Sequence, residues 1–191
     1  NVKDAQGNVT GRTTTNDYAQ ADYYYVDKSS LPKVYGGFNT AFSYKGFELS
    51  AIFAYSIGGY IVDRDVTMLW SNGSNPGRAW STEILKRWTP ENRDTDVPAL
   101  KTVSNNWNSN STRNLFNNSY LRMKNITLSY NFPQPLIKKI SLSSLQLFVQ
   151  ADNLLTFSKN QGMDPEQGIT GLTYYRYPAM RSISGGLNVS F

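Results

Sequence analysis

The side chains that most often carry catalysis are missing from this sequence. It contains no histidine and no cysteine, which removes the commonest general base and metal ligand, thiolate nucleophiles and disulfides. Catalysis would have to depend on carboxylates, lysines or tyrosines. Glycoside hydrolysis, for example, needs two carboxylates at a defined separation around a sugar, and no such pair stands out. We therefore predict that the protein is not an enzyme and has no metal site or cofactor.

Asp164 and Glu166 are two carboxylates that could act as metal ligands. They flank Pro165, and oxygen donors in a loop could bind calcium. Their spacing is not that of a calcium loop, and Asp and Pro favour turns, so a turn is the preferred interpretation. The charged run from Asp63 to Asp65 is interpreted as the polar entry of a short helix, with acid near the positive end of its dipole.

Four tryptophans offer a different kind of chemistry, because aromatic faces can stack on sugar rings or pack against a partner protein. All four fall within residues 58–119. Helical spacing over residues 79–88 favours a small core belonging to this loop itself. We prefer that interpretation, with partner contact second and direct substrate contact third. The four residues are Trp70, Trp80, Trp88 and Trp107.

The amino-acid composition is typical of a protein that lies at a boundary between water and an apolar environment. Aromatic residues make up 14% of the chain, with thirteen tyrosines, while charged residues make up 17%. Tyrosine suits positions where one end of the side chain is apolar and the other is wet, including membrane girdles. The net charge of +5 is spread along the chain and is not clustered as in a nucleic-acid-binding face, so no nucleic-acid partner is expected.

The elements that carry these side chains are predicted to be strands. Five segments alternate apolar and polar residues with period two, as a strand with two unlike faces does. In the last one, Ile183, Leu187 and Val189 alternate with Ser184, Asn188 and their neighbours. No apolar run approaches the roughly 20 residues of a transmembrane helix, whereas a tilted barrel strand needs about 9–11. The predicted strands are residues 34–45, 46–57, 119–132, 142–152 and 180–191.

Short and long connections alternate between these strands. A tight turn at Lys45 and Gly46 and a linker over 133–141 contrast with long loops over 58–118 and 153–179; residues 1–33 are interpreted as the remainder of a further loop. This is the layout of outer-membrane barrels. The predicted fold class is all-β: an antiparallel meander that forms the last strands of a large transmembrane β-barrel, with long extracellular loops carrying short helices. A soluble β-sandwich that binds carbohydrate is the alternative.

Several segments of the chain resemble known motifs when they are taken together and in order. The segments are Arg87–Asn92 with Asp96–Pro98, Ser119–Tyr130, Asp152–Phe157, Asp164–Glu166 and Tyr177–Ser182. In this order they are similar to the SusC/RagA family of TonB-linked outer-membrane transporters, and the resemblance covers residues 31–191. The final strand also resembles the closing strand of such barrels, where Leu187, Val189 and Phe191 would form the signal read by the barrel-assembly machinery.

The resemblance implies a large barrel around an N-terminal plug, in the cell outer membrane of a Gram-negative bacterium. Such a transporter imports oligosaccharides or peptides together with a SusD-like surface lipoprotein. The implied partners are the missing N-terminal barrel and plug, that lipoprotein, TonB acting through the plug, outer-membrane lipid and the substrate. The chain starts at Asn1 without a methionine or signal segment, so we expect its N-terminus to be cut.

Overall fold

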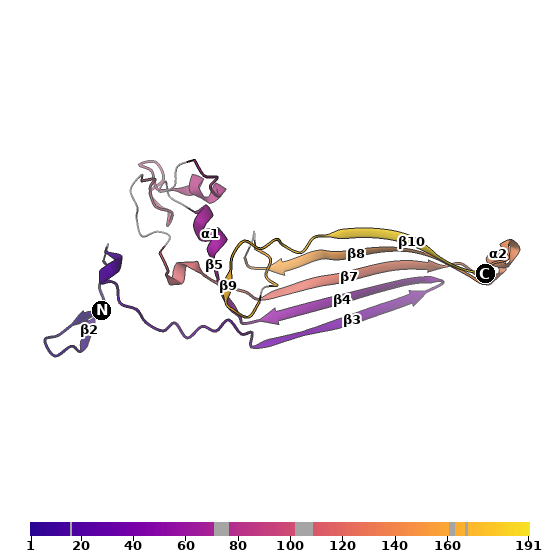
Figure 1. The fold of residues 1–191 in the computed structure, drawn as a ribbon, viewed down its shortest axis with the longest axis horizontal. Coiled ribbons are helices and arrows are strands. Elements are labelled where there is room, and N and C mark those ends of the chain that lie inside the picture. Colours follow the sequence, from indigo (N-terminus) through magenta and orange to yellow (C-terminus); the bar gives the residue numbers. More distant parts are fainter. Residues whose placement is uncertain (16, 71–76, 102–108, 161–162, 167) are drawn as a thin grey trace. The chain divides into compact units, whose positions relative to one another are not determined.

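The computed structural model describes residues 1–15, 17–70, 77–101, 109–160, 163–166 and 168–191. They form two compact units. One comprises residues 1–28 and 62–115, and the other comprises residues 29–61 and 116–191. The second unit contains a five-stranded sheet (Figure 1). Among the described residues, no helix is both long and apolar enough to cross a membrane.

The five-stranded sheet is an antiparallel meander, which confirms the predicted fold class. Its order is β10-β8-β7-β4-β3, and every neighbouring pair is antiparallel. β3 and β10 therefore form its two edges. The strands are β3 (Val34–Tyr44), β4 (Phe47–Ile57), β7 (Tyr120–Asn131), β8 (Ser144–Ser158) and β10 (Ser182–Ser190).

The register places the alternating residues on two unlike faces. One row across the sheet consists of Phe42, Leu49, Leu128, Val149 and Gly185. The next row consists of Ala41, Ser50, Thr127, Gln150 and Ser184. Because successive side chains point to opposite sides of a strand, the first row belongs to what we call the apolar face and the second to what we call the polar face.

The turn between β3 and β4 depends on one glycine. Lys45 and Gly46 both have positive φ, at 47° and 88°, as a two-residue type I′ hairpin requires. The Gly46 carbonyl accepts a 2.8 Å hydrogen bond from the Asn131 amide of β7. A Cβ at Gly46 would lie 2.8 Å from the Asn131 carbonyl oxygen, so glycine is required by both its conformation and its surroundings.

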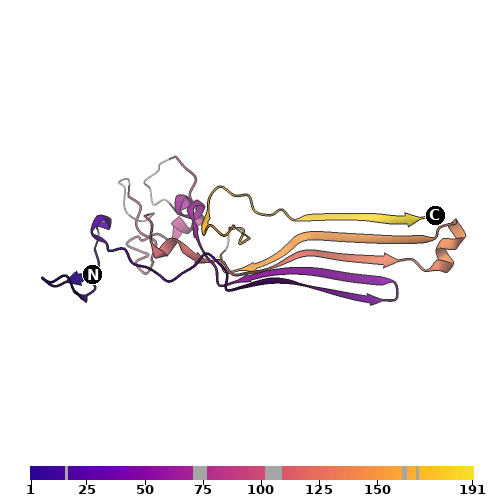
Figure 2. The same cartoon turned by 60° about the horizontal axis from the view of Figure 1, so that its bottom comes forward.

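A short helical linker connects β7 to β8. It consists of α2 (Gln134–Ile137) and the 3₁₀ turn η5 (Lys138–Ile140). Pro133 precedes the first helical residue, Ile137 is buried, and Ser141 ends the linker with φ 59°. This linker and the C-terminus lie at the same end of the sheet as the β3–β4 turn (Figures 1 and 2). The connections between β4 and β7 and between β8 and β10 leave from the opposite end of the sheet (Figures 1 and 2).

The remaining elements are short. Asp63 caps α1 by accepting hydrogen bonds from the amides of Asp65 and Val66, which confirms the predicted helix entry. The elements are β1 (Val2–Lys3), β2 (Val9–Gly11), η1 (Tyr18–Gln20), β5 (Tyr60–Asp63), α1 (Arg64–Leu69), η2 (Thr82–Lys86), η4 (Thr112–Asn114), β6 (Leu115–Asn117) and β9 (Leu172–Thr173).

Two expected boundaries differ from the structure. β8 continues six residues past its predicted end at 152. Asn153, with φ 52°, lies where the register between β7 and β8 shifts, so the strand passes through a bulge at the place where the sequence predicts the start of a long loop. The helix expected over residues 79–88 is the 3₁₀ helix Thr82–Lys86. It stops at Arg87, whose ψ of 156° is extended.

Candidate functional site

Hydrogen-bonded amides and hydroxyls line the polar face of the sheet. Asn188 of β10 donates to Gln146 of β8 over 2.9 Å. Nearer the loops, the Asp152 carboxylate accepts from Asn125 at 2.7 Å and from Ser182 Oγ at 3.1 Å. Asp152 thus joins three neighbouring strands. A face built this way offers donors and acceptors to a polar ligand, or to another polar part of the same protein.

Phe148 is the aromatic exception on this polar face. It lies directly opposite Gly186 of β10, and a Cβ at Gly186 would come within 2.8 Å of its ring. The ring therefore covers the glycine backbone, an arrangement that stabilises glycine in a strand. This pairing explains why an apolar residue interrupts the alternation of β8.

A cluster of four charged side chains occupies the loop end of the polar face. Arg122 of β7 lies at its centre: its Nη1 donates to Glu166 over 2.8 Å, and its Nη2 donates to Asp164. Its Nε donates to Thr156 Oγ1 of β8 over 3.1 Å. Lys124 Nζ donates to Glu166 over 2.6 Å. The cluster pairs two cations with two carboxylates.

A bulge in β7 brings both cations to this place. Ile52 of β4 pairs with Asn125, but Phe53 pairs with Met123, so Lys124 is an extra residue in the ladder. The bulge shifts the alternation, and the residues on the apolar face change from Leu121 and Met123 to Ile126 and those that follow. Alternating patterns read from the sequence miss this shift, because a bulge has no fixed residue signature.

Asp164 and Glu166 form ion pairs and a turn. The Glu166 amide donates to Asp164 Oδ1 over 2.9 Å, which confirms the predicted turn. Burial acts to raise the pKa of Asp164, but hydrogen bonds from the Ala179 amide, Arg122 and the Glu166 amide outweigh it and hold that pKa below its ordinary value. In the described parts of the chain, no group of three or more acidic residues is placed to hold a metal ion.

The predicted loop tryptophans have unlike environments. Trp70 lines a hollow with Ile84, Val97 and Arg113, and Trp80 is half-buried. Trp88 has 43% of its surface exposed. Trp107 lies outside the described residues. Trp70 and Trp80 thus fit a core of the loop itself, whereas Trp88 offers an accessible aromatic face; a contact of any of them with substrate or partner stays a prediction.

The segment after η2 is a folded turn. Thr89 and Asn92 form an isolated bridge, and the Asn92 side-chain amide donates to the carbonyls of Lys86 and Arg87 at 3.0 and 3.2 Å. These carbonyls are the end groups of a helix, which need such donors. The Arg87–Asn92 motif therefore has a structural explanation.

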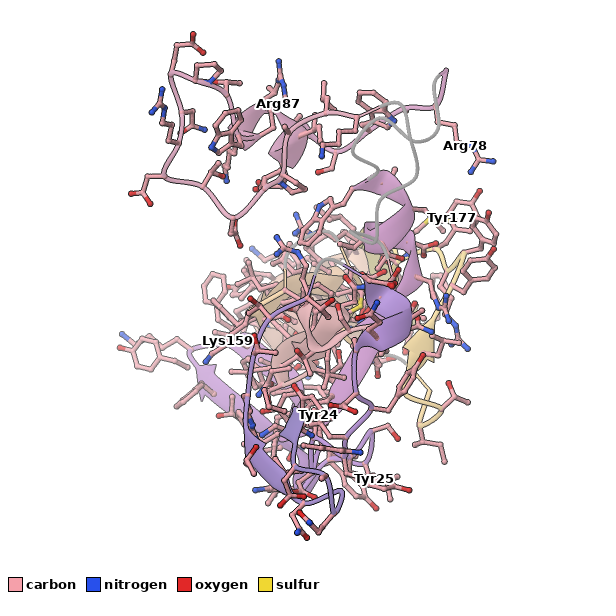
Figure 3. All side chains as sticks on the ribbon, turned by 90° about the vertical axis from the view of Figure 1, so that its left-hand side faces the viewer. Tyr24, Tyr25, Arg78, Arg87, Lys159 and Tyr177 are labelled. Atoms are coloured by element: carbon pink, nitrogen blue, oxygen red, sulfur yellow. The ribbon has the colours of Figure 1, made fainter. Side chains whose placement is uncertain are left out.

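Exposed tyrosines form a feature that the residue-by-residue sequence argument misses. The rings of Tyr174 and Tyr175 lie 4.1 Å apart between centroids, and Tyr177 has 98% of its surface exposed. In the other compact unit, Tyr24 and Tyr25 are exposed as well; Figure 3 labels these two residues and Tyr177. The high tyrosine content was the available signal, but composition does not say which tyrosines reach the surface.

The residues of the proposed assembly signal lie at the other end of the sheet. Leu187 and Val189 pair with Leu147 and Leu145 of β8 on the apolar face. Phe191 follows β10, and its carbonyl oxygen accepts a 2.9 Å hydrogen bond from Ser143 Oγ. Their role in barrel assembly stays a prediction.

Comparison with known proteins gives consistent relatives. No protein-family model matches the chain. It is 32% identical to the TonB-dependent receptor P3 of Formosa agariphila over 166 residues, which cover 81% of this chain and 16% of that protein. It is 30% identical to receptor P39 of the same organism, over 82% of this chain and 16% of that protein. The chain thus spans about a sixth of the length of these curated relatives.

Solved structures give the same answer at the level of the fold. The RagAB peptide importer in its closed-closed state matches with a TM-score of 0.77 and 33% identity, over all of this chain and 20% of that chain. The open-open state matches with a TM-score of 0.73 and 32% identity, over 94% of this chain and 19% of that chain.

Proposed function

We propose that this chain, which belongs to the SusC/RagA-like TonB-dependent transporters of the Gram-negative outer membrane, forms the closing wall of an importer for oligosaccharides or peptides. Its five strands would complete a barrel begun by segments that this sequence does not contain. The long connections would lie outside the cell, and the short turns in the periplasm.

The exposed apolar face of the sheet is the observation that carries this proposal. Phe42, Leu128 and Val149 lie in one row across it and are 67%, 48% and 51% exposed. Contiguous apolar surface of this extent is unusual in soluble proteins. It is the expected outer surface of a barrel wall, where residues facing lipid alternate with residues facing a polar interior.

The burial pattern disfavours the alternative of a soluble β-sandwich. A sandwich buries the inner faces of two sheets against each other. In the described part of this chain, the buried hydrophobic residues are Ala51, Ile61, Ile137 and Ala151. Only Ala51 and Ala151 belong to the apolar face, and both are small. A face that remains open in this way needs lipid or further protein to cover it.

Aromatic residues border the apolar face near the expected membrane interfaces. Tyr44, Phe47 and Tyr130 lie in register at the short-turn end, while Tyr55 and Phe157 lie toward the loops. Phe47 and Tyr55 are eight positions apart on β4, which is roughly 26 Å along the strand at about 3.3 Å per residue. With the usual tilt of roughly 40°, the height is about 20 Å, comparable with the roughly 25 Å apolar band of such barrels.

The polar face and the relatives support the proposed substrate class. Amides, hydroxyls and carboxylates on that face suit polar oligomers, and the similar solved structures are of a peptide importer. We propose a SusD-like lipoprotein as the outer partner and TonB, acting through the plug, as the source of energy. The binding site for TonB would lie with the plug, in another part of the protein.

The proposal is tested by import through the full-length transporter in its own host. A strain lacking the gene is compared with one carrying it and with one whose TonB-contacting segment is deleted. Labelled oligosaccharides and labelled peptides of several lengths form separate arms. We expect saturable, TonB-dependent uptake in one arm and co-purification of a surface lipoprotein. Uptake that is linear with concentration and independent of TonB would indicate a passive porin and contradict the proposal.

A further inference from the structure

We propose that the loop before β10, in its described residues 163–166 and 168–181, is a fixed inner rim of the barrel mouth, clamped to the wall by Arg122 and Lys124. The inference rests on the proposed function, because a mouth exists only if the sheet is part of a barrel. Within it, Arg122 acts as a positioning residue: it holds the loop on the polar face. Substrate would pass a stationary edge here, not a lid that swings.

Asp164 is the point where three segments of the chain are joined. Its carboxylate pairs with Arg122 of β7. It also accepts the Glu166 amide, which closes the local turn, and the Ala179 amide over 2.6 Å. Ala179 lies fifteen residues further along the chain, just before β10. One carboxylate therefore fixes the outgoing and the returning parts of the loop to the same strand.

Glu166 forms the second arm of the clamp. Its two oxygens accept hydrogen bonds from Arg122 and Lys124, so it binds two cations that lie two positions apart on β7. The β7 bulge is what allows both cations to reach it. Charge-assisted hydrogen bonds to a planar guanidinium are directional, and they specify one position for the loop and disfavour a range of positions.

Burial separates this cluster from an ordinary surface ion pair. The side chains of Arg122 and Asp164 are 4% and 9% exposed, while those of Lys124 and Glu166 are 34% and 37% exposed. Removing one partner from a buried pair leaves an uncompensated charge. Opening the loop would separate Asp164 from Arg122 in the same way, so the cluster opposes opening.

Neutral hydrogen bonds extend the clamp beyond the charges. Asn118 Nδ2 donates to the Pro165 carbonyl over 2.8 Å, and Ser30 Oγ donates to the Ile169 carbonyl over 2.7 Å. Asn153 Nδ2 donates to the Met180 carbonyl over 3.1 Å. Loops that open during function are drawn from regions with few such contacts. This loop is tied to the segment before β3, to the approach to β7 and to β8.

Cross-linking tests whether the loop stays in place during transport. The chain has no cysteine, so Asn118→Cys and Pro165→Cys can be introduced into a full-length transporter free of other reactive thiols. A short bifunctional thiol reagent then joins the loop to the wall. We expect import within about twofold of the same double variant without reagent. A loss of tenfold or more, with the single-cysteine variants unaffected by reagent, would show a moving lid and overturn the inference.

Hydrogen exchange provides a second readout that does not depend on transport. We expect Arg122→Met to increase amide exchange at least tenfold in peptides covering residues 163–180. Lys86→Gln, which breaks the exposed Lys86–Glu83 pair in another loop, should leave those peptides unchanged. Equal exchange in wild type and Arg122→Met would overturn the clamp even if import is normal. Protected exchange without any import would instead refute the proposed function and leave the clamp intact.

Discussion

Neighbouring residues on one strand are expected to face different solvents. Val149 of β8 lies on the apolar face, in a row with Leu128 and Gly185, while Gln150 lies in a row with Thr127 and Ser184. The solvent that a residue faces depends on which side of the strand its side chain occupies, and little on its local secondary structure. The same substitution should therefore have very different effects on stability at two consecutive positions of one strand.

Arginine substitutions measure this difference. We expect Val149→Arg to destabilise the folded barrel in lipid by about 2–4 kcal/mol, because it places a charge in the bilayer. Leu187→Arg should cost less, because Leu187 shares its row with Tyr130 near the expected interface. The matched control Gln150→Arg should change the folding free energy by less than about 1 kcal/mol, since it faces the polar interior. Equilibrium folding of the full-length barrel into liposomes gives all three values, and equal costs at 149 and 150 would contradict the assignment of faces.

Acid should release the clamp only at low pH. The pKa of Asp164 is depressed in the folded state, so its stabilising effect is complete above the ordinary pKa of about 3.9 and is lost as pH falls through the lower folded value. A nitroxide attached at Tyr177→Cys should show constant mobility from pH 7 to pH 5 and increased mobility only below about pH 4. An increase centred near pH 6 would show that Asp164 does not hold the loop as proposed.

The connections of the sheet differ in how sensitive they are to a single substitution. The β3–β4 turn has one requirement, a glycine at positive φ against the β7 backbone. The described parts of the loop over residues 58–119 contain short helices, a capped turn and half-buried tryptophans, which are held by many weaker contacts. The first can be disrupted by a single methyl group, whereas the second should yield gradually.

The turn gives the sharper of the two element-scale predictions. Gly46→Ala forces a Cβ into positive φ and within 2.8 Å of the Asn131 carbonyl oxygen, so we expect a loss of about 1–3 kcal/mol of folding free energy. Lys45→Asn, at φ 47°, should be nearly neutral because asparagine tolerates that conformation. Urea titrations of both variants in liposomes provide the comparison, and a neutral Gly46→Ala would mean that the turn rearranges freely.

Two tryptophans separate the loop core from a contact surface. We expect Trp88→Ala to weaken binding of the lipoprotein partner about tenfold, as loss of an accessible interface aromatic commonly does, without increasing hydrogen exchange in residues 64–70. Trp70→Ala, which removes a wall of the loop's own hollow, should increase that exchange. Titration of the purified full-length variants with the lipoprotein measures the first effect. If Trp88→Ala binds normally and Trp70→Ala does not, the roles are reversed.

The strands of the sheet could be predicted from the sequence, but the bulges within them could not. Alternation identifies a strand because its cause, one wet face and one apolar face, acts at every residue. It cannot find the bulge at Lys124 or the continuation of β8 through Asn153, since these depend on pairing with neighbouring strands. The ion pairs of Arg122 could not be predicted for a similar reason. Asp164 and Glu166 lie 42 and 44 positions from Arg122 in the sequence, and only the folded chain brings them together.

At the scale of the whole molecule, the chain is a section of wall with two open edges. Among the described residues, β3 and β10 each have a neighbouring strand on one side only, and in a membrane the other side must also be paired because lipid provides no hydrogen bonds. A closed barrel would pair both edges of this sheet, with the apolar face against lipid and the polar face against the lumen and plug. Both import through the barrel and the clamped rim at its mouth require that placement of the sheet.

Spin-label accessibility along β8 tests this placement most directly. Single cysteines at Leu145, Gln146, Leu147, Gln150 and Ala151 are labelled in the full-length transporter in outer-membrane lipid. We predict high collision rates with oxygen at 145, 147 and 151, where the labels meet lipid, and lower rates at 146 and 150, where only a water-soluble quencher should reach them. Uniform access of the water-soluble quencher to all five positions would contradict the account, because it would mean that neither face of this sheet lies in a membrane.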